Sequence, residues 1–225
     1  MSGKAVSNRL LWVDQTKGIA IITVSICHIC DVFFETKTPL QKWGYSWELF
    51  AFFFLGGMLF RIKERYRLSL PDYLIRQAKG IIYPYFTLSA FSIVFINRGH
   101  GIKNTLLFIG LGAMWFLPVY FISSVLSFLI SKYIKEYKAK LIATVGIIVL
   151  TICFSTIIIH DYYDEVWKRE GVMAIALVNR CLIAISIFML GFFSGSPNAI
   201  KKFEAIRNPF IACAFLIGGV LVWRI

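Results

Sequence analysis

Apolar runs alternate with short polar and basic segments along almost the whole chain. A helix needs roughly 20 apolar residues to cross a bilayer, and most of these runs approach that length. The pattern therefore predicts membrane-spanning helices. The seven predicted spans are 18–34, 46–60, 81–96, 113–130, 141–159, 172–193 and 209–223. We predict an all-α fold, a polytopic transmembrane helical bundle of about seven spans, as a single integral-membrane domain over residues 1–225.

The composition agrees with this interpretation and changes the meaning of the charge. Of 225 residues, 58% are hydrophobic and 16% charged, with a formal net charge of +12. In a soluble protein that charge would suggest nucleic acid. Here basic cytoplasmic loops beside anionic lipid account for it, so we expect membrane lipid and no nucleic acid as a partner.

The loops differ in their content of Lys and Arg. The segments before span one and after spans two, four and six carry more than twice as many basic residues as the opposite loops. Positive loops stay on the cytoplasmic side, so the N-terminus is predicted to be cytoplasmic. We expect a multi-pass protein of the cell membrane, plasma or inner.

The first apolar run contains the main candidate for chemistry. Asp14 and Lys17 lie just before it, and it encloses His28, eleven residues after Lys17. At about 100° per residue the two share a helix face, and at about 1.5 Å rise His28 lies roughly 16 Å deeper in the membrane. An ionisable group at that depth indicates function. The alternatives are a neutral His satisfied by a neighbouring helix, and a Lys17 that snorkels beside Asp14.

Further charged residues lie near the predicted spans. Arg76 and Lys79 are three residues apart and neighbour each other at a membrane boundary. They either bind an anion or are ordinary positive charge of a cytoplasmic loop. Arg180 lies within span six, where it must contact a substrate or form an ion pair. Asp31 and Glu35 follow His28 and could orient it or meet a substrate, and Glu35 could equally be a solvated loop residue.

Cys27, His28, Cys30 and Asp31 superficially suggest a metal site. Consecutive helix residues point about 100° apart, so Cys27 and His28 cannot easily share one ion. We predict no metal.

Four stretches together resemble a known family. They are Trp12-x-Asp14-x-x-Lys17-Gly18 with His28 beyond it, the run Phe52 to Gly57, Arg76-x-x-Lys79 followed by Tyr83-Pro84-Tyr85, and Trp115-Phe116-Leu117-Pro118. In this order they are similar to membrane-bound acyltransferases of the acyltransferase-3 type. The closer resemblance is to the sugar O-acetylase branch, which includes fucose-O-acetylase-like proteins.

The resemblance implies an O-acyltransferase that moves an acyl group, most often acetyl, from acyl-CoA to a hydroxyl of a cell-surface or lipid-linked glycan. His28 would be the general base, with Lys17 and Asp14 as further catalytic positions. Arg76 and Lys79 would hold the phosphates of acetyl-CoA; the family usually has Arg at both, and Lys79 lacks the bidentate fork. Trp115 lies in one of the four matching stretches, and from their positions in the sequence we expect Asp31, Glu35 and Arg180 to meet the acceptor with it.

The resemblance also raises a question about length, because such proteins usually have more spans than seven. The chain is then a truncated product, a naturally short member, or one whose remaining helices come from a partner or a second copy. Two alternatives to the enzyme stay open: a glycan or lipid transporter with His28 and Arg180 along its pathway, and a non-catalytic membrane fragment.

Overall fold

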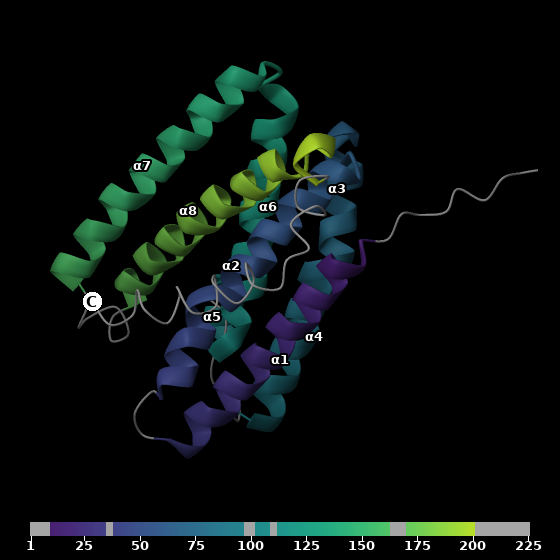
Figure 1. Cartoon of the computed structure of the whole chain (residues 1–225). Helices are drawn as coiled ribbons and strands as arrows, with labels where there is room; N and C mark the ends of the chain where they lie inside the picture. The colour runs from purple at the N-terminus through teal and green to yellow at the C-terminus, as the bar shows by residue number, and fades with distance from the viewer. Residues whose placement is uncertain (1–9, 35–37, 97–101, 109–111, 163–169, 201–225) are drawn as a thin grey trace, which may run out of the picture.

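The computed structural model describes residues 10–34, 38–96, 102–108, 112–162 and 170–200, and every regular element in these ranges is helical (Figure 1). The α-helices are α1 Leu11–Phe33, α2 Pro39–Ile62, α3 Leu70–Gln77, α4 Tyr83–Phe91, α5 Ile102–Leu106, α6 Phe116–Tyr133, α7 Tyr137–Tyr162 and α8 Glu170–Ser194. The short 3-10 and π segments are η1 Arg65–Arg67, η2 Ala78–Ile82, η3 Ser92–Ile96 and η4 Gly112–Trp115. The prediction of an all-α fold is confirmed.

Five helical stretches of the described chain are long and apolar enough to cross a membrane. They are Trp43–Ile62, Leu70–Phe95, Phe116–Tyr133, Tyr137–Ile157 and Ile175–Ser194, and they correspond to predicted spans two to six. Predicted span one lies in α1, a helix of 23 residues that is not among the five. Predicted span seven, 209–223, lies outside the described residues. The total of seven therefore stays a prediction.

The third span is one continuous helical stretch built from α3, η2, α4 and η3. It begins where the sequence places a helix start: the Ser69 hydroxyl accepts a hydrogen bond from the Asp72 N–H at 3.2 Å. Pro84 has no N–H to donate to the preceding turn and its ring would crowd the carbonyl of Gly80. The π turn Ala78–Ile82 lies at that point and widens the helix just before the proline.

Helix α8 lies at the centre of the arrangement and packs against α2, α6 and α7, while α1 packs against α2 (Figure 1). Aromatic side chains fill the space between α2, α3, α6 and α8. Tyr73 stacks on Phe128 at 4.3 Å between ring centroids, and Phe60 contacts both rings and Phe188. These buried rings fix the order of the helices around α2 and α8.

Glycines bring the backbones of α2 and α8 into direct contact. A Cβ on Gly57 would lie 1.8 Å from the carbonyl oxygen of Phe188, and one on Gly191 would lie 2.0 Å from that of Phe54. No side chain fits at either position. This is the close packing of small residues that membrane helices use in the absence of a hydrophobic force between them. It gives a physical reason for Gly57, the last residue of the run Phe52 to Gly57, whereas a Cβ on Gly56 would meet the Tyr120 hydroxyl of α6 at 2.4 Å.

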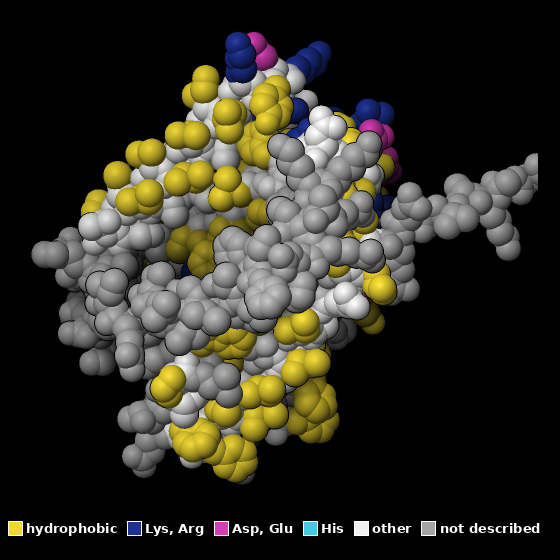
Figure 2. Space-filling model, in the orientation of Figure 1, with side chains coloured by type: hydrophobic (Ala, Val, Ile, Leu, Met, Phe, Trp, Pro, Cys, Tyr) yellow, Lys and Arg dark blue, Asp and Glu magenta, His cyan; other side chains and the backbone are white. Residues whose placement is uncertain are grey.

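The outer surface is apolar along the helices and basic at one end. Helix α7 presents Ile142, Val145, Val149 and Ile152 outward, each more than half exposed, and Figure 2 shows the apolar side chains of this face. Lys and Arg gather where α2 ends, where α6 turns into α7 and beside α3, at the top of the same view. Apolar flanks with one basic end are typical of a membrane protein.

We predict that Gly57→Ala lowers the thermal unfolding midpoint of the detergent-solubilised protein, because its methyl group would force α2 and α8 apart. The free energy of unfolding should fall by about 1–3 kcal/mol or more, where 1–3 kcal/mol is the usual cost of overpacking. Gly146→Ala in α7 is the matched control, since a Cβ there meets nothing within 4 Å. Equal midpoints for the two variants would show that the α2–α8 contact does not limit stability.

Candidate active site

A cavity of about 570 Å³ opens between α1, α2, α8 and the junction of η4 with α6. It has the size of a small-molecule site. Its polar lining residues are Ser25, His28, Asp31, Tyr45, Glu48 and Arg180. Of the residues singled out in the sequence, the structure brings His28, Asp31, Trp115 and Arg180 together here.

The imidazole of His28 is held on its Nδ1 side. Nδ1 lies 3.7 Å from Oδ2 of Asp31 and 3.4 Å from the hydroxyl of Tyr45, which donates a hydrogen bond to the same carboxylate oxygen. The His28 and Tyr45 rings also form a T-shaped contact at 5.7 Å between centroids. Every polar contact of this ring within the described chain thus involves Nδ1. A carboxylate at Nδ1 favours the tautomer whose Nε2 accepts a proton.

Asp31 is itself fixed by the start of α2. The side-chain N–H of Gln41 donates to Oδ1 of Asp31 at 2.8 Å and to the backbone carbonyl of Cys27 at 3.4 Å. The side-chain oxygen of Gln41, Oε1, accepts a hydrogen bond from the backbone N–H of Thr38 at 2.7 Å and so completes a capping box. Gln41 is 1% exposed. One buried amide therefore ties the first turn of α2 to the carboxylate beside His28.

Sequence reasoning missed Gln41 and Tyr45. A signal for Gln41 was present, because Thr38 followed three residues later by Gln, just before an apolar run, is the pattern of a capping box. No comparable signal marked Tyr45. Gly44 explains how Tyr45 reaches His28: a Cβ on Gly44 would lie 2.4 Å from the Cys27 sulfur, so its absence lets α1 and α2 approach closely.

Arg180 and Trp115 form the opposite wall. The guanidinium carbon of Arg180 lies 4.2 Å from the centroid of the Trp115 ring, a cation–π contact. Both residues also line a smaller neighbouring cavity of about 170 Å³ between α2 and α8. The adjacent Asn179 accepts a hydrogen bond from Ser155 of α7 at 2.7 Å, which fixes the rotation of α8 at this level.

Lys17 and Asp14 do not line this cavity, although they lie on the same helix as His28. Lys17, just before predicted span one, instead lies near Lys63 and Arg65 at the basic end. Burial and then the charge of Lys63 lower the pKa of Lys17. Burial and then the neighbouring Arg76 lower the pKa of Arg65. We call these four residues (Lys17, Lys63, Arg65 and Arg76) the basic cluster; Lys63 and Arg65 had not been singled out from the sequence.

One atom of the basic cluster has no partner. The Nε of Arg65 is buried and makes no hydrogen bond in the described structure. Neighbouring cations disfavour the charged forms of Lys17 and Arg65, although Asp14 offsets part of this effect at Lys17. With the Arg65 donor left unpaired, this is an arrangement that an anion would stabilise.

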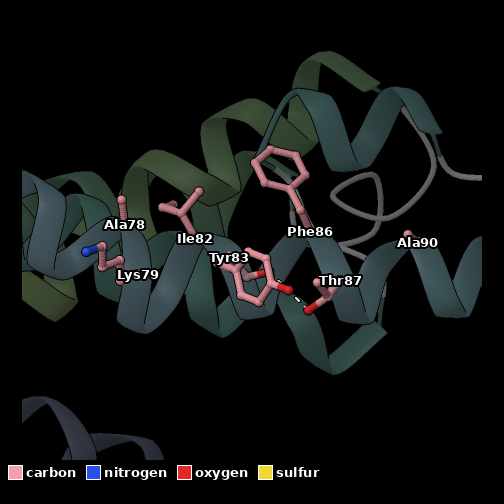
Figure 3. Close-up of a pocket in the computed structure, with 7 residues that line it drawn as sticks. All are labelled: Ala78, Lys79, Ile82, Tyr83, Phe86, Thr87 and Ala90. Carbon is pink, nitrogen blue, oxygen red and sulfur yellow. Dashed lines mark hydrogen bonds between the residues drawn. The ribbon is translucent and has the colours of Figure 1, made fainter.

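Lys79 lies three residues after Arg76 on the same continuous helical stretch. It borders an open groove of about 720 Å³ on the outside of η2 and α4, where Tyr83, Phe86 and Thr87 project (Figure 3). This groove shares no lining residue with the His28 cavity.

Glu35 lies outside the described residues. Among the described residues, no three His, Cys, Asp or Glu side chains are grouped closely enough to hold a metal ion.

Residues 10–225 match a family model described as an acyltransferase domain. The chain belongs to the acyltransferase-3 family. No curated protein and no solved structure matches it. The chain is therefore an acyltransferase that transfers groups other than aminoacyl groups, and its apolar helices make it a membrane protein. Family membership favours the enzyme over the transporter and the non-catalytic fragment.

Proposed function

We propose that this acyltransferase is an O-acyltransferase that moves an acetyl group from acetyl-CoA to a hydroxyl of a cell-surface or lipid-linked glycan. The observation that carries the proposal is the His28 imidazole held at Nδ1 by Asp31 and Tyr45, within a cavity large enough for a small ligand. The four stretches similar to the sugar O-acetylase branch support acetyl as the acyl group and a sugar as the acceptor.

In the proposed reaction Nε2 of His28 takes the proton of the acceptor hydroxyl as its oxygen attacks the thioester carbonyl. Asp31 stabilises the imidazolium that forms. The carbon–sulfur bond of the tetrahedral intermediate then breaks, and the proton passes to the CoA thiolate, which leaves as the free thiol. The oxygen of the intermediate carries negative charge, and Arg180 is the cation that lines the same cavity.

The phosphates of CoA bind at the basic cluster in this proposal. Arg76 keeps the role that the sequence suggested, Arg65 offers its unpaired Nε, and Lys63 and Lys17 add charge. Lys79 would contribute from the outer surface. Lys17 then serves the donor and not the proton transfer, since it lies outside the His28 cavity.

The orientation follows from the same charges. Because basic segments remain on the cytoplasmic side, the basic end would face the cytoplasm, with the N-terminus and with acetyl-CoA. The protein would be a multi-pass component of the cell membrane with about seven spans. A second copy or a partner that supplies further helices is compatible with this arrangement.

We predict that His28→Gln lowers acetyl transfer at least a hundredfold, the usual contribution of a general base. Asp31→Asn should lower it about tenfold or more while leaving the binding of acetyl-CoA unchanged, because the phosphates of CoA bind at the basic cluster and not beside Asp31. The measurement is incorporation of labelled acetyl into the glycan fraction of membranes that contain each variant. Glu136→Gln, an exposed carboxylate between α6 and α7, is the control. Full transfer by His28→Gln would exclude it as the base.

The donor site predicts a change in the KM of acetyl-CoA. Replacing Arg65 and Arg76 together by Gln should raise this KM about tenfold or more, with a smaller effect of salt than in the wild type, since two charge-assisted contacts are lost. The control is the pair Lys135→Gln and Lys138→Gln, which removes equal charge from exposed positions near the same end.

The same assay in oriented vesicles tests the side of entry. Acetyl-CoA should support transfer when it is added to inside-out vesicles and not when it is added to right-side-out ones. If the Arg65/Arg76 and Lys135/Lys138 double variants have the same KM for acetyl-CoA, the phosphates of CoA do not bind at the basic cluster. Transfer only in right-side-out vesicles would reverse the topology.

A further inference from the structure

Glu48 is a buried carboxylate that the mechanism above does not use. It lies on α2, one helical turn after Tyr45, and lines the cavity that contains His28. Its side chain is 1% exposed, and its Oε2 is buried without a hydrogen-bond partner. No basic side chain of the described chain forms an ion pair with it.

A buried carboxylate oxygen without a donor is costly and needs an explanation. The thiol of Cys27 hydrogen bonds to the Glu48 side chain, but a thiol is a weak donor. Gly44, one turn earlier on α2, has no side chain to offer. The protein thus keeps an acceptor unpaired beside an open cavity, where a bound ligand could supply the missing donor.

The surroundings suit a ligand that carries hydroxyl groups. Coenzyme A carries its negative charge on its phosphates, which the carboxylates of Glu48 and Asp31 would repel, so only its thioester end would enter this cavity. A hydroxyl is a neutral donor that a carboxylate accepts readily. Leu49 and Phe52 give the same wall an apolar surface on which a sugar ring can pack. Residues three apart on a helix have Cβ atoms about 5–6 Å apart, so one sugar can reach both the level of Tyr45, where His28 lies, and that of Glu48.

We propose that Glu48 binds the acyl acceptor, its Oε2 accepting a hydrogen bond from a second hydroxyl of a polyol whose first hydroxyl lies at Nε2 of His28. This inference rests on the proposed function and narrows it. The acceptor must carry at least two hydroxyls within one ring or on adjacent rings, and Glu48 decides which of them faces the base.

The test uses methyl hexopyranosides and their singly deoxygenated derivatives as acceptors, with labelled acetyl-CoA and the full chain in nanodiscs. Glu48→Gln should lower acceptor kcat/KM about tenfold and Glu48→Leu about a hundredfold, as expected for loss of a hydrogen bond to a charged group. The KM of acetyl-CoA should not change. For the wild type, one deoxygenated sugar should have a kcat/KM about a hundredfold below that of its parent glycoside. For Glu48→Leu, this sugar and its parent should have equal kcat/KM.

Two results would overturn the role of Glu48. One is unchanged acceptor kcat/KM in Glu48→Gln and Glu48→Leu. The other is an undiminished loss for every deoxygenated sugar in Glu48→Leu, which would show that no hydroxyl is coupled to this residue. Glu136→Gln is the matched control, and the near-isosteric Glu48→Gln keeps the test valid if Glu48→Leu does not fold.

Failure of the proposed function is separable from failure of this inference. If the wild type transfers acetyl to no sugar, calorimetric titration of the same methyl glycosides decides the question. Binding that weakens about tenfold in Glu48→Gln would support a polyol site without acetylation. Equal binding by the variant, or no binding by the wild type, would reject Glu48 as a sugar ligand.

Discussion

The backbone contact between α2 and α8 is the constraint on which the rest of the structure depends. Gly57 and Gly191 allow the two helices to touch, and no larger residue fits at either position. Once α8 is fixed against α2, Arg180 on α8 faces Tyr45 and Glu48 on α2 across the cavity. Gly44 plays the same part for α1, because its missing side chain lets α1 approach α2 and places His28 beside Tyr45. Three glycine contacts thus determine where a pocket can remain among otherwise close-packed helices.

The polar groups of the bundle separate into two sets with different chemistry. The basic cluster at one end contains two half-buried cations, Lys17 and Arg65, each beside a further cation, and it suits an anion. The cavity combines a base held by a carboxylate with a second carboxylate, one of whose oxygens has no hydrogen-bond partner, and an arginine stacked on a tryptophan. A donor with phosphates and an acceptor with hydroxyls would find different partners in the two sets. This separation is the physical reason to place the two substrates at different parts of one membrane protein.

Much of this could be predicted from the sequence, since ionisable residues within apolar runs are costly and therefore informative. His28, Asp31, Trp115 and Arg180 were singled out on that basis or by resemblance, and one cavity contains all four. Lys17 and His28 were predicted to share one helix face about 16 Å apart, and Lys17 lies outside the cavity that His28 lines. Arg76 and Lys79 were expected to act together as a phosphate site, which stays a prediction; Lys79 lies in the π turn and borders the outer groove of α4. Glu48 was not predictable, because its significance lies in its missing partner and in its place beside the cavity, and only the packing of α1 against α2 reveals both.

The central claim is that acyl transfer takes place in the His28 cavity and not in the outer groove of α4. The most direct measurement is photocrosslinking with a CoA thioester whose acyl group carries a diazirine, followed by mass spectrometry of the labelled peptides. We predict adducts on cavity residues of α2, such as Tyr45 and Phe52, that excess acetyl-CoA suppresses. Adducts confined to Tyr83 and Phe86 of the outer groove would contradict the account.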